Sequence, residues 1–328
     1  MIATQNISLS YSGKPLFKNV NIKFTAGNCY GIIGANGTGK STFLKVLSGE
    51  LEPTTGEVVI TPGERMAVLR QNHFEFDSYE VLQTVIMGHK RLYEIMKEKD
   101  ELYAKEDFTD ADGERASELE GEFAELDGWN AESNAEMILT GLGISLDLEH
   151  KLMSELDGSQ KVKVLLAQAL FGNPDILLLD EPTNYLDIQS VRWLENFLLD
   201  FPNTVIVVSH DRAFMDNMVD RVAEVDNGQV NLYKGNYSAY LKAREERLER
   251  LRAEAAKQAE EIAHMEAFVE KFRYKPTKAK QVQDRVKKLE KIKRIELPEE
   301  KKTVHFNFKQ PPRTGDEVVR ARGLVKRF

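Results

Sequence analysis

One eight-residue motif constrains the fold more than any other part of this chain. Residues Gly34–Ser41, Gly-Ala-Asn-Gly-Thr-Gly-Lys-Ser, match the pattern G-x-x-x-x-G-K-[ST] in full. The apolar stretch Asn28–Gly34 predicts a buried strand before the motif, and Thr42–Ser48 predicts a helix after it, with Gly49 as its cap. In such a context, glycines let backbone N–H groups surround phosphate oxygens, and the helix N-terminus adds positive potential. The motif therefore predicts a nucleoside-phosphate site.

An apolar run that ends in two acidic residues supplies the expected partner of this loop. Ile176–Asp180 predicts a strand that ends at Asp180, which would hold Mg²⁺, and Glu181 would then polarise the attacking water. Lys40 would neutralise the β- and γ-phosphates, and the Ser41 hydroxyl would bind Mg²⁺. The residues predicted to contact the nucleotide are Gly34, Asn36, Gly37, Thr38, Gly39, Lys40, Ser41 and Thr42.

The distribution of apolar residues predicts an α/β fold. Thr204–His210 is a continuous apolar run like Ile176–Asp180, and such runs are typical of parallel strands covered on both faces. Helical segments between them complete the α/β pattern. The first 80 residues are rich in expected strands, namely Ile2–Leu9, Gly56–Ile60 and Arg65–Leu69.

The region from His89 to Glu136 is acidic, with 16 Asp and Glu against 6 Lys and Arg. Apolar residues at helical spacing predict one helix around Leu92–Tyr103 and a second around Leu119–Leu126, with Asp107–Gly113 as the turn. We interpret the region as an acidic helical arm inserted at about residues 88–136. An ordinary helical subdomain with a solvated face is the alternative.

The period changes to a heptad repeat from Leu241 onwards. The main seam comprises Leu248, Leu251, Ala255, Gln258, Ile262, Met265, Val269 and Phe272, and a weaker one comprises Val282, Val286, Leu289 and Ile292. Pro276 separates the two seams and would break the helix, so we expect an antiparallel coiled-coil hairpin as a linker. Residues 241–313 carry 21 Lys and Arg against 13 Asp and Glu, although the whole chain has a net charge of −8. Opposite charge in different parts of a chain indicates separate partners, and two solvated surfaces are the alternative.

The final residues repeat the pattern of the first strand. Residues 318–328 align with the opening residues, so that Val319, Leu324 and Phe328 match Ile2, Ile7 and Tyr11. We expect the start of a second, truncated copy of the first domain at 314–328, with a coincidental terminal strand as the alternative. The expected organisation is a nucleotide-binding domain at 1–240, a basic linker at 241–313 and this truncated copy.

Composition excludes several other classes of protein. Cys29 is the only cysteine, which excludes a disulfide framework and fits a reducing, cytoplasmic location. No apolar run approaches the roughly 20 residues of a membrane span, and the first six residues do not have the pattern of a signal peptide.

These motifs together resemble an ABC-type ATPase domain. The resemblance rests on residues 180–187, Asp-Glu-Pro-Thr-Asn-Tyr-Leu-Asp, and on Val208–Arg212 with its histidine. It implies ATP and Mg²⁺ as cofactors, and it implies that Gln71 senses Mg²⁺ and the water, that His210 contacts the γ-phosphate and that Tyr11 stacks on adenine. It also implies that Asn184, Leu186 and Asp187 contact a partner domain. For His210 and Tyr11, simple packing in the core is the alternative.

The architecture resembles one group within that family, the ABC-F proteins, which act on the ribosome. The absence of a membrane segment, the arm after Gln71 and the charged helical linker before a second domain carry this resemblance. It implies that the arm contacts the ribosome near the E site and that the linker extends towards P-site tRNA. Residues 271–294 contain 11 basic and 2 acidic residues, which would attract RNA phosphates. The predicted RNA contacts are Lys271, Arg273, Lys275, Lys278, Lys280, Arg285, Lys287 and Lys288, and a solvated coiled coil is the alternative.

Two features depart from the family pattern. The signature L-S-G-G-Q is Leu156, Asp157, Gly158, Ser159 and Gln160 here. A carboxylate at Asp157 would repel the partner's nucleotide phosphates, which predicts a weakened composite site. The apparent truncation also leaves half of each composite site, so hydrolysis is expected to be slow unless the chain dimerises or has its second domain.

Two other classes of function remain open from the sequence. One is the ATP-binding subunit of a membrane transporter, and the other is a scaffold that binds ATP without hydrolysing it. The leading hypothesis is an ATPase that binds the ribosome and acts in translation.

Overall fold

The computed structural model describes residues 1–11, 14–69, 74–273, 278–295 and 320–326, and the side chains of Tyr11 and Lys14 are outside this description. The chain forms two compact units, Met1–Arg250 and Leu251–Phe328, which are described separately below.

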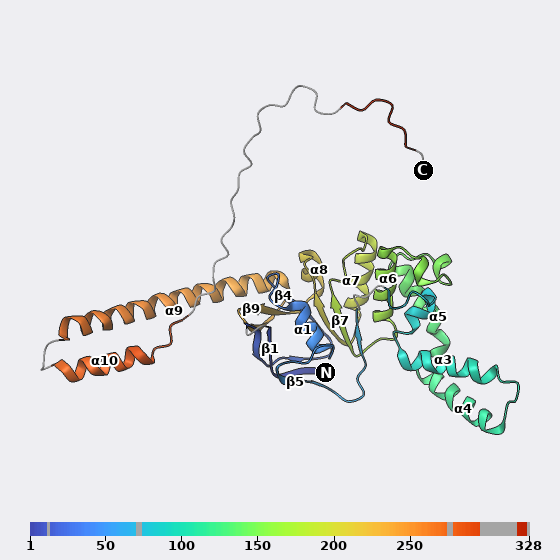
Figure 1. Cartoon of the computed structure of the whole chain (residues 1–328), viewed down its shortest axis with the longest axis horizontal. Coiled ribbons are helices and arrows are strands. Elements are labelled where there is room, and N and C mark those ends of the chain that lie inside the picture. The colour runs from blue at the N-terminus through green and yellow to red at the C-terminus, as the bar shows by residue number, and fades with distance from the viewer. Residues whose placement is uncertain (12–13, 70–73, 274–277, 296–319, 327–328) are drawn as a thin grey trace. The chain divides into compact units, whose positions relative to one another are not determined.

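A six-stranded sheet forms the centre of the first unit (Figure 1). Its order is β10-β9-β4-β8-β7-β6, and all neighbours are parallel except β10 and β9. The strands are β4 (Asn28–Gly34), β6 (Met66–Val68), β7 (Ile176–Asp180), β8 (Thr204–Val208), β9 (Arg221–Asp226) and β10 (Gln229–Lys234). The predicted apolar runs therefore do form the buried parallel strands of an α/β fold.

Side chains alternate between the two faces of this sheet, and each face has its own core. In β7, Ile176 and Leu178 join one core, whereas Leu177 and Leu179 join the other. This alternation follows from the two-residue period of a strand. Because both faces are covered, every residue from Ile176 to Leu179 is fully buried, and the strand has no polar face.

An antiparallel sheet and helix α1 (Lys40–Leu47) contribute to one of these cores. In this sheet β1 pairs with β2, β3 and β5, and Phe17 of β2 meets Phe43 of α1 edge to face, with ring centroids 5.3 Å apart. The four strands are β1 (Ile2–Tyr11), β2 (Lys14–Val20), β3 (Lys23–Phe24) and β5 (Thr55–Ile60).

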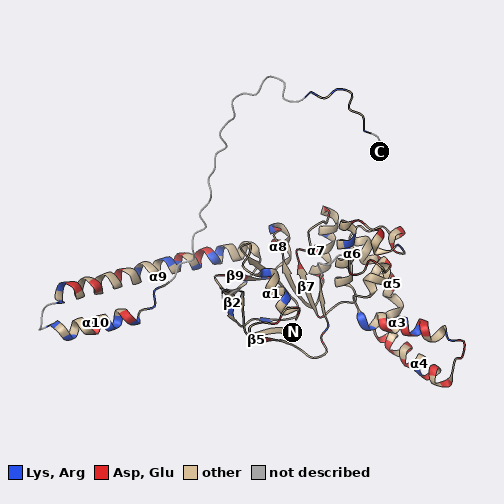
Figure 2. Cartoon of the chain, in the orientation of Figure 1, with Lys and Arg blue, Asp and Glu red and all other residues tan. Residues whose placement is uncertain are grey.

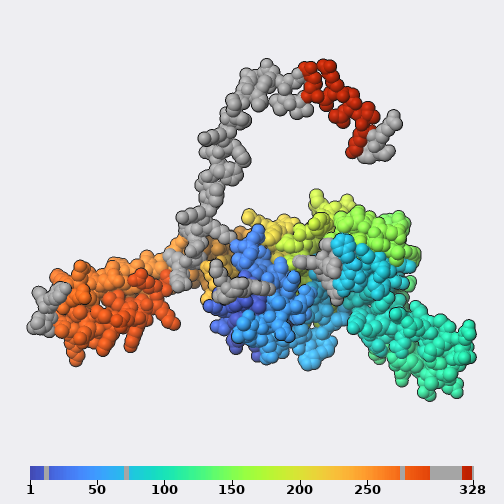
Figure 3. Space-filling view, in the orientation of Figure 1, coloured from blue at the N-terminus to red at the C-terminus, as the bar shows by residue number. Residues whose placement is uncertain are grey.

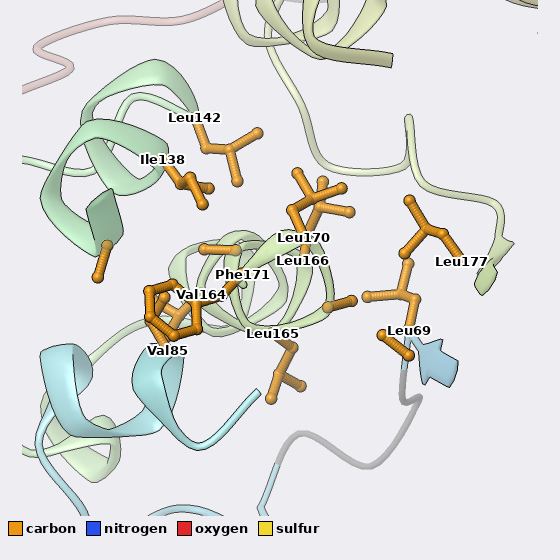
Figure 4. Packing of buried hydrophobic residues seen from close by; sticks show 14 of the residues in the cluster. Leu69, Val85, Ile138, Leu142, Val164, Leu165, Leu166, Leu170, Phe171 and Leu177 are labelled. Atoms are coloured by element: carbon orange, nitrogen blue, oxygen red, sulfur yellow. The ribbon is translucent and has the colours of Figure 1, made fainter. Parts of the chain in front are cut away.

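Helices cover the opposite face of the central sheet. Figure 4 shows α6 between α2, α5 and the strand ends, with Val164, Leu165 and Leu166 in contact with these neighbours. The helices are α2 (Val81–Ile86), α5 (Ala131–Gly141), α6 (Gly158–Leu170), α7 (Ile188–Leu199) and α8 (Arg212–Met218), with 3₁₀ turns η1 (Gly128–Asn130), η2 (Leu146–Leu148) and η3 (Met153–Glu155).

The acidic insertion forms a hairpin of α3 (Lys90–Tyr103) and α4 (Asp110–Glu125), which projects from the first unit (Figure 3). In Figure 2, positions of Asp and Glu, coloured red, recur along both helices. The predicted turn, Asp107–Gly113, was wrong in its extent. The Thr109 side chain accepts a hydrogen bond from Asp112 N, and the Asp112 carboxylate accepts one from Thr109 N, so this capping box starts α4 inside the expected turn.

The second unit contains the end of α9 (Tyr237–Phe272) and α10 (Ala279–Lys291). The Arg285 guanidinium lies 3.6 Å from the centroid of the Phe268 ring. Farther from the turn, the Gln258 side chain donates to the Lys293 carbonyl at 3.0 Å and accepts from Ile295 N at 2.9 Å. Gln258 contacts residues 293 and 295, whereas Phe268, later in α9, contacts the earlier residue Arg285, so the two segments are antiparallel. The polar side chain of Gln258 therefore has two backbone partners. The coiled-coil packing itself stays a prediction.

Two further predictions concern a second copy of the first domain at 314–328 and membrane-spanning segments. Among the residues expected to repeat the first strand, Arg320–Lys326 forms no strand, because the pattern alone does not supply the neighbours that β1 has in β2, β3 and β5. The remaining residues of 314–328 lie outside the described part. None of the described helices has the length and apolar character needed to span a membrane.

A substitution at Gly88, between α2 and α3, tests how closely this segment packs against α6. A Cβ added at Gly88 would lie 2.0 Å from the Gln168 carbonyl oxygen on α6, so Gly88→Ala is expected to cost roughly 1–3 kcal/mol. Gly121 lies in α4 with open space around it, so Gly121→Ala is expected to stabilise by about 0.5–1 kcal/mol. Thermal or denaturant unfolding of both variants checks this, and equal midpoints would contradict it.

Candidate functional site

The loop between β4 and α1 has the geometry of a phosphate-binding loop. Gly37 and Gly39 have φ angles of 81° and 97°, a region that favours glycine. The Lys40 ammonium is buried and donates to the carbonyl oxygens of Gly34 and Ala35 at 3.1 and 3.2 Å. A Cβ at Gly34 would lie 2.6 Å from the Val225 carbonyl oxygen. The loop therefore rests directly on β9, and Lys40 lies beneath it.

The acidic end of β7 lies beside the end of β8. Asp180 is the register partner of Val208, and Glu181 N donates to the Val208 carbonyl at 2.8 Å. The Glu181 carboxylate accepts from His210 N at 3.1 Å and lies 3.6 Å from His210 Nε2. Two predicted catalytic residues, Glu181 and His210, are thus in contact.

One cavity of about 710 Å³ brings most of the predicted nucleotide site together. The predicted site residues that line this cavity are Asn36, Gly37, Gly39, Lys40, Ser41, Thr42, Asp180, Glu181, Asn184 and His210. Gly34 and Thr38 do not line it, because Gly34 packs on β9 and the Thr38 hydroxyl donates to the Ala35 carbonyl at 2.9 Å. The lining residues that sequence reasoning missed are Leu16, Leu69, Val162, Tyr185 and Val208. They belong to no motif, apart from Tyr185 and Val208, which lie inside quoted motifs without an assigned role.

The predicted domain-contact loop, residues 184–187, forms hydrogen bonds with neighbouring residues at both of its ends. Asn184 N donates to the Glu181 carbonyl at 3.1 Å, and Leu186 lines a neighbouring cavity. The Asp187 carboxylate caps α7 by accepting from Ser190 N at 2.9 Å. That hydrogen bond, with one from Lys163, lowers the pKa of Asp187.

The acidic residue of the signature has a structural role that the sequence analysis missed. The Asp157 carboxylate accepts from Gln160 N at 2.9 Å, and the Gln160 side chain accepts from Asp157 N at 3.1 Å. These two bonds form a capping box at the start of α6. Ser159 Oγ donates to the Tyr185 carbonyl at 3.3 Å, which links the signature to the domain-contact loop. Repulsion between Asp157 and a partner's nucleotide stays a prediction.

A buried carboxylate fixes the first turns of α9 to the central sheet. Glu224 on β9 is 5% exposed and accepts from Tyr240 Oη and Arg244 Nε, both at 2.7 Å, and from Tyr233 Oη at 3.1 Å. Glu224 precedes Val225, whose carbonyl supports the phosphate-binding loop. Burial beside this carboxylate raises the pKa of Tyr240. The beginning of the helix that leads to the linker is thus attached one residue away from the support of the loop.

Some predicted site residues lie outside the described part, namely Gln71, Lys275 and the side chain of Tyr11. Among the predicted RNA contacts, Lys271, Arg273, Lys280, Lys287 and Lys288 are exposed. Lys278 donates to Gln281 at 3.1 Å, and Arg285 packs over Phe268. Arg285 is therefore engaged within the hairpin, which its sequence position did not indicate.

The capping role of Asp157 can be measured separately from ATP chemistry. Asp157→Ala removes the cap and is expected to lower the stability by about 1 kcal/mol, whereas Asp157→Ser keeps a capping oxygen and should lose less. Chemical denaturation of the two variants checks this order. Equal stability of the alanine variant and the unchanged protein would contradict it.

Comparison with known proteins is consistent with this geometry. A family model described as "ABC transporter" matches residues 17–184, just over half of the chain, and a second with the same description matches 223–308. The chain is similar to "Uncharacterized ABC transporter ATP-binding protein YkpA" of Bacillus subtilis (strain 168), with 55% identity over 99% of this chain and 61% of the relative. It is 43% identical to "Probable ATP-binding protein YbiT" of Escherichia coli O157:H7, over 100% of this chain and 62% of the relative.

A human relative and a solved structure extend the comparison. "ATP-binding cassette sub-family F member 3" of Homo sapiens is 30% identical over 94% of this chain and 43% of its own length. A solved structure described as "Dimeric Structure of MJ0796, a Bacterial ABC Transporter Cassette" has a TM-score of 0.52 and 23% identity, and the match covers 71% of this chain and 98% of that chain. The chain thus spans about three fifths of the length of the first two relatives. The chain belongs to the ABC ATPase family, whose domain binds ATP, and it has a subfamily F protein among its relatives.

Proposed function

We propose that this protein is an ABC-F ATPase that hydrolyses ATP with Mg²⁺ and acts on the ribosome during translation. The observation that carries the proposal is one chain that joins an ABC ATPase unit to a basic helical hairpin. An acidic arm and a subfamily F relative support it further. Cytoplasmic location and contact with ribosomal RNA and P-site tRNA are parts of the same proposal.

The residues of the cavity fit ATP and a divalent cation. Ser41 and Asp180 line the same cavity, and hydroxyl and carboxylate oxygens are ligands that Mg²⁺ prefers. Within the described part, no cluster of three His, Cys, Asp or Glu could hold a metal alone, which agrees with a cation that takes further ligands from phosphates and water. When bound, Mg²⁺ would neutralise charge on the β- and γ-phosphates.

Different residues of the chain would bind the phosphates and activate the attacking water. The loop N–H groups bind phosphate oxygens, and Lys40 moves from its two carbonyl partners to the phosphates. The Glu181 carboxylate, oriented by His210 N, accepts a hydrogen bond from the attacking water. His210 is mostly exposed beside it, lines the same cavity and would contact the γ-phosphate. The second half of each composite site would come from a second ABC domain or from a homodimer.

The hairpin supplies the electrostatic part of the proposal. Its exposed basic side chains would bind phosphate backbones with affinity that falls steeply with salt and with little sequence preference. The attachment of α9 at Glu224, next to the support of the phosphate-binding loop, offers a route by which nucleotide binding influences the linker.

Two substitutions separate binding from hydrolysis. Lys40→Ala removes the phosphate-binding ammonium and is expected to weaken ATP binding, as measured by equilibrium titration. Glu181→Gln keeps the shape of the side chain without the charge, so hydrolysis at the site on this chain's own phosphate-binding loop should fall by about 10²-fold or more while ATP stays bound. Hydrolysis by Glu181→Gln at the unchanged rate, in the protein with its second domain, would overturn the role of Glu181.

The RNA contacts are tested by charge removal on the hairpin. A variant with Arg273, Lys280, Lys287 and Lys288 changed to Gln should bind RNA more weakly, and its affinity should depend less on salt, by about 0.7–0.9 in log–log slope for each RNA phosphate that is no longer neutralised. A matched variant changes four exposed lysines of the first unit to Gln, namely Lys18, Lys23, Lys151 and Lys234. Filter binding at several salt concentrations compares them, and equal slopes for both variants would argue against RNA contact.

Fractionation of a lysate tests the proposal against its two competitors. The protein carries Glu181→Gln and the equivalent change in its second domain, and ribosome and membrane fractions are compared with and without ATP at moderate salt. Movement into the ribosome fraction with ATP is the expected result. Movement to membranes would favour a transporter subunit, and no dependence on ATP would favour a scaffold that does not turn over.

A further inference from the structure

Helix α6 buries two lysines directly after the signature. Lys161 and Lys163 are 6% and 8% exposed, although lysine is among the residues least often buried unless it is paired. Because they are two residues apart on a helix, their side chains point to different sides of it. Each lysine ammonium forms an ion pair with a carboxylate on its own side of the helix, Lys161 with Asp77 and Lys163 with Asp187.

The Lys161 ammonium pairs with the Asp77 carboxylate and lies 5.1 Å from the centroid of the Phe74 ring. Asp77 belongs to segment 74–80, which follows in sequence the range that contains Gln71. Backbone hydrogen bonds join this segment to the one that leads into the signature, since Ser154 N donates to the Asp77 carbonyl at 3.2 Å and Met153 N donates to Tyr79 O at 2.9 Å. Lys161 therefore connects α6 to the segment that follows the predicted Mg²⁺-sensing glutamine.

On another side of α6, Lys163 Nζ lies 3.0 Å from Asp187 Oδ2 and 3.5 Å from Ser190 Oγ. Ser190 Oγ in turn donates to the Leu142 carbonyl at 2.9 Å. Asp187 ends the domain-contact loop and caps α7. Lys163 therefore connects the same helix to the loop that would meet the partner domain.

We propose that Lys161 and Lys163 are positioning residues, which hold the signature at the place where it meets the nucleotide of the partner domain. This inference rests on the proposed function, because the signature acts only in a composite site. Neither lysine lines the cavity of this unit's own nucleotide, so ATP binding there does not depend on them. Asp77 and Asp187 are partly exposed, at 35% and 58% of their side chains, so loss of the lysine charge leaves a carboxylate that water still reaches, and its cost in stability is measured by the unfolding of each variant. A displacement of about 1 Å in a catalytic arrangement, in contrast, can cost up to about 10²-fold in rate.

The test isolates the composite site that uses this signature. In the protein with its second domain, Glu181→Gln silences the site on this chain's own phosphate-binding loop. ATP hydrolysis is then measured in a single turnover with enzyme in excess, so that the remaining rate constant belongs to the other site. ATP affinity and thermal unfolding are measured for every variant.

Lys161→Met and Lys163→Met, which keep side-chain length without the charge, are expected to slow this step by about tenfold or more. Their ATP affinity should stay within about twofold. The arginine variants, which keep the charge, should retain the rate within about threefold. The exposed Lys151, close to the signature in sequence, gives the control Lys151→Met, which should not change it. The reversed pair Lys161→Asp with Asp77→Lys should regain part of the rate lost by Lys161→Asp alone.

Unchanged rates for both methionine variants would overturn the inference, as would a rate loss explained by a smaller folded fraction. Arginine variants as slow as the methionine variants would also overturn it. If the protein with its second domain hydrolyses no ATP even with Glu181 intact, the proposed function fails first and the inference fails with it.

Discussion

The parallel register of β4, β8 and β7 is the constraint on which the site depends. Ile32 pairs with Val208, and Val208 pairs in turn with Asp180. Since the carboxyl ends of parallel strands lie at one edge of a sheet, three sequence-distant segments end together there. The phosphate-binding loop, the acidic pair and His210 follow these three strand ends directly. A shift of one residue in the β7–β8 pairing would separate Glu181 from His210, and the same shift between β4 and β8 would move the phosphate-binding loop away from His210. Either shift would also turn the buried side chains of the shifted strand to the opposite face.

Local patterns predicted the parts of the fold that local chemistry determines. The phosphate-binding loop, the parallel strands and both helices of the arm all follow from glycine spacing, apolar runs and helical periodicity. The predicted helix break at Pro276 lies outside the described residues. The extent of the arm's turn was predicted wrongly, because the reciprocal bonds of Thr109 and Asp112 extend α4 into it. The Asp157 capping box uses the same chemistry, in which the carboxylate accepts a hydrogen bond from Gln160 N at the start of α6.

Pairs of residues distant in sequence could not be predicted from the sequence. Lys161 is 84 residues from Asp77, and Glu224 meets Arg244 from a different secondary structure element. A charged residue in a sequence carries no sign of whether it is solvated or buried with a partner. The apolar residues that line the cavity could not be predicted either, because Leu16 and Val162 belong to no motif.

The polar position in the linker seam has a consequence for how this hairpin can change during evolution. The Gln258 amide bonds two backbone groups on the opposite arm, at Lys293 and Ile295, and so fixes which residues face each other. An insertion of one residue between Gln258 and the turn would rotate everything beyond it by about 100° and break that match. In the predicted coiled coil, length changes that preserve the seam would have to add whole heptads, balanced on both arms. If the segment packs as the predicted coiled coil, the distance between its two ends can therefore change only in steps of whole heptads.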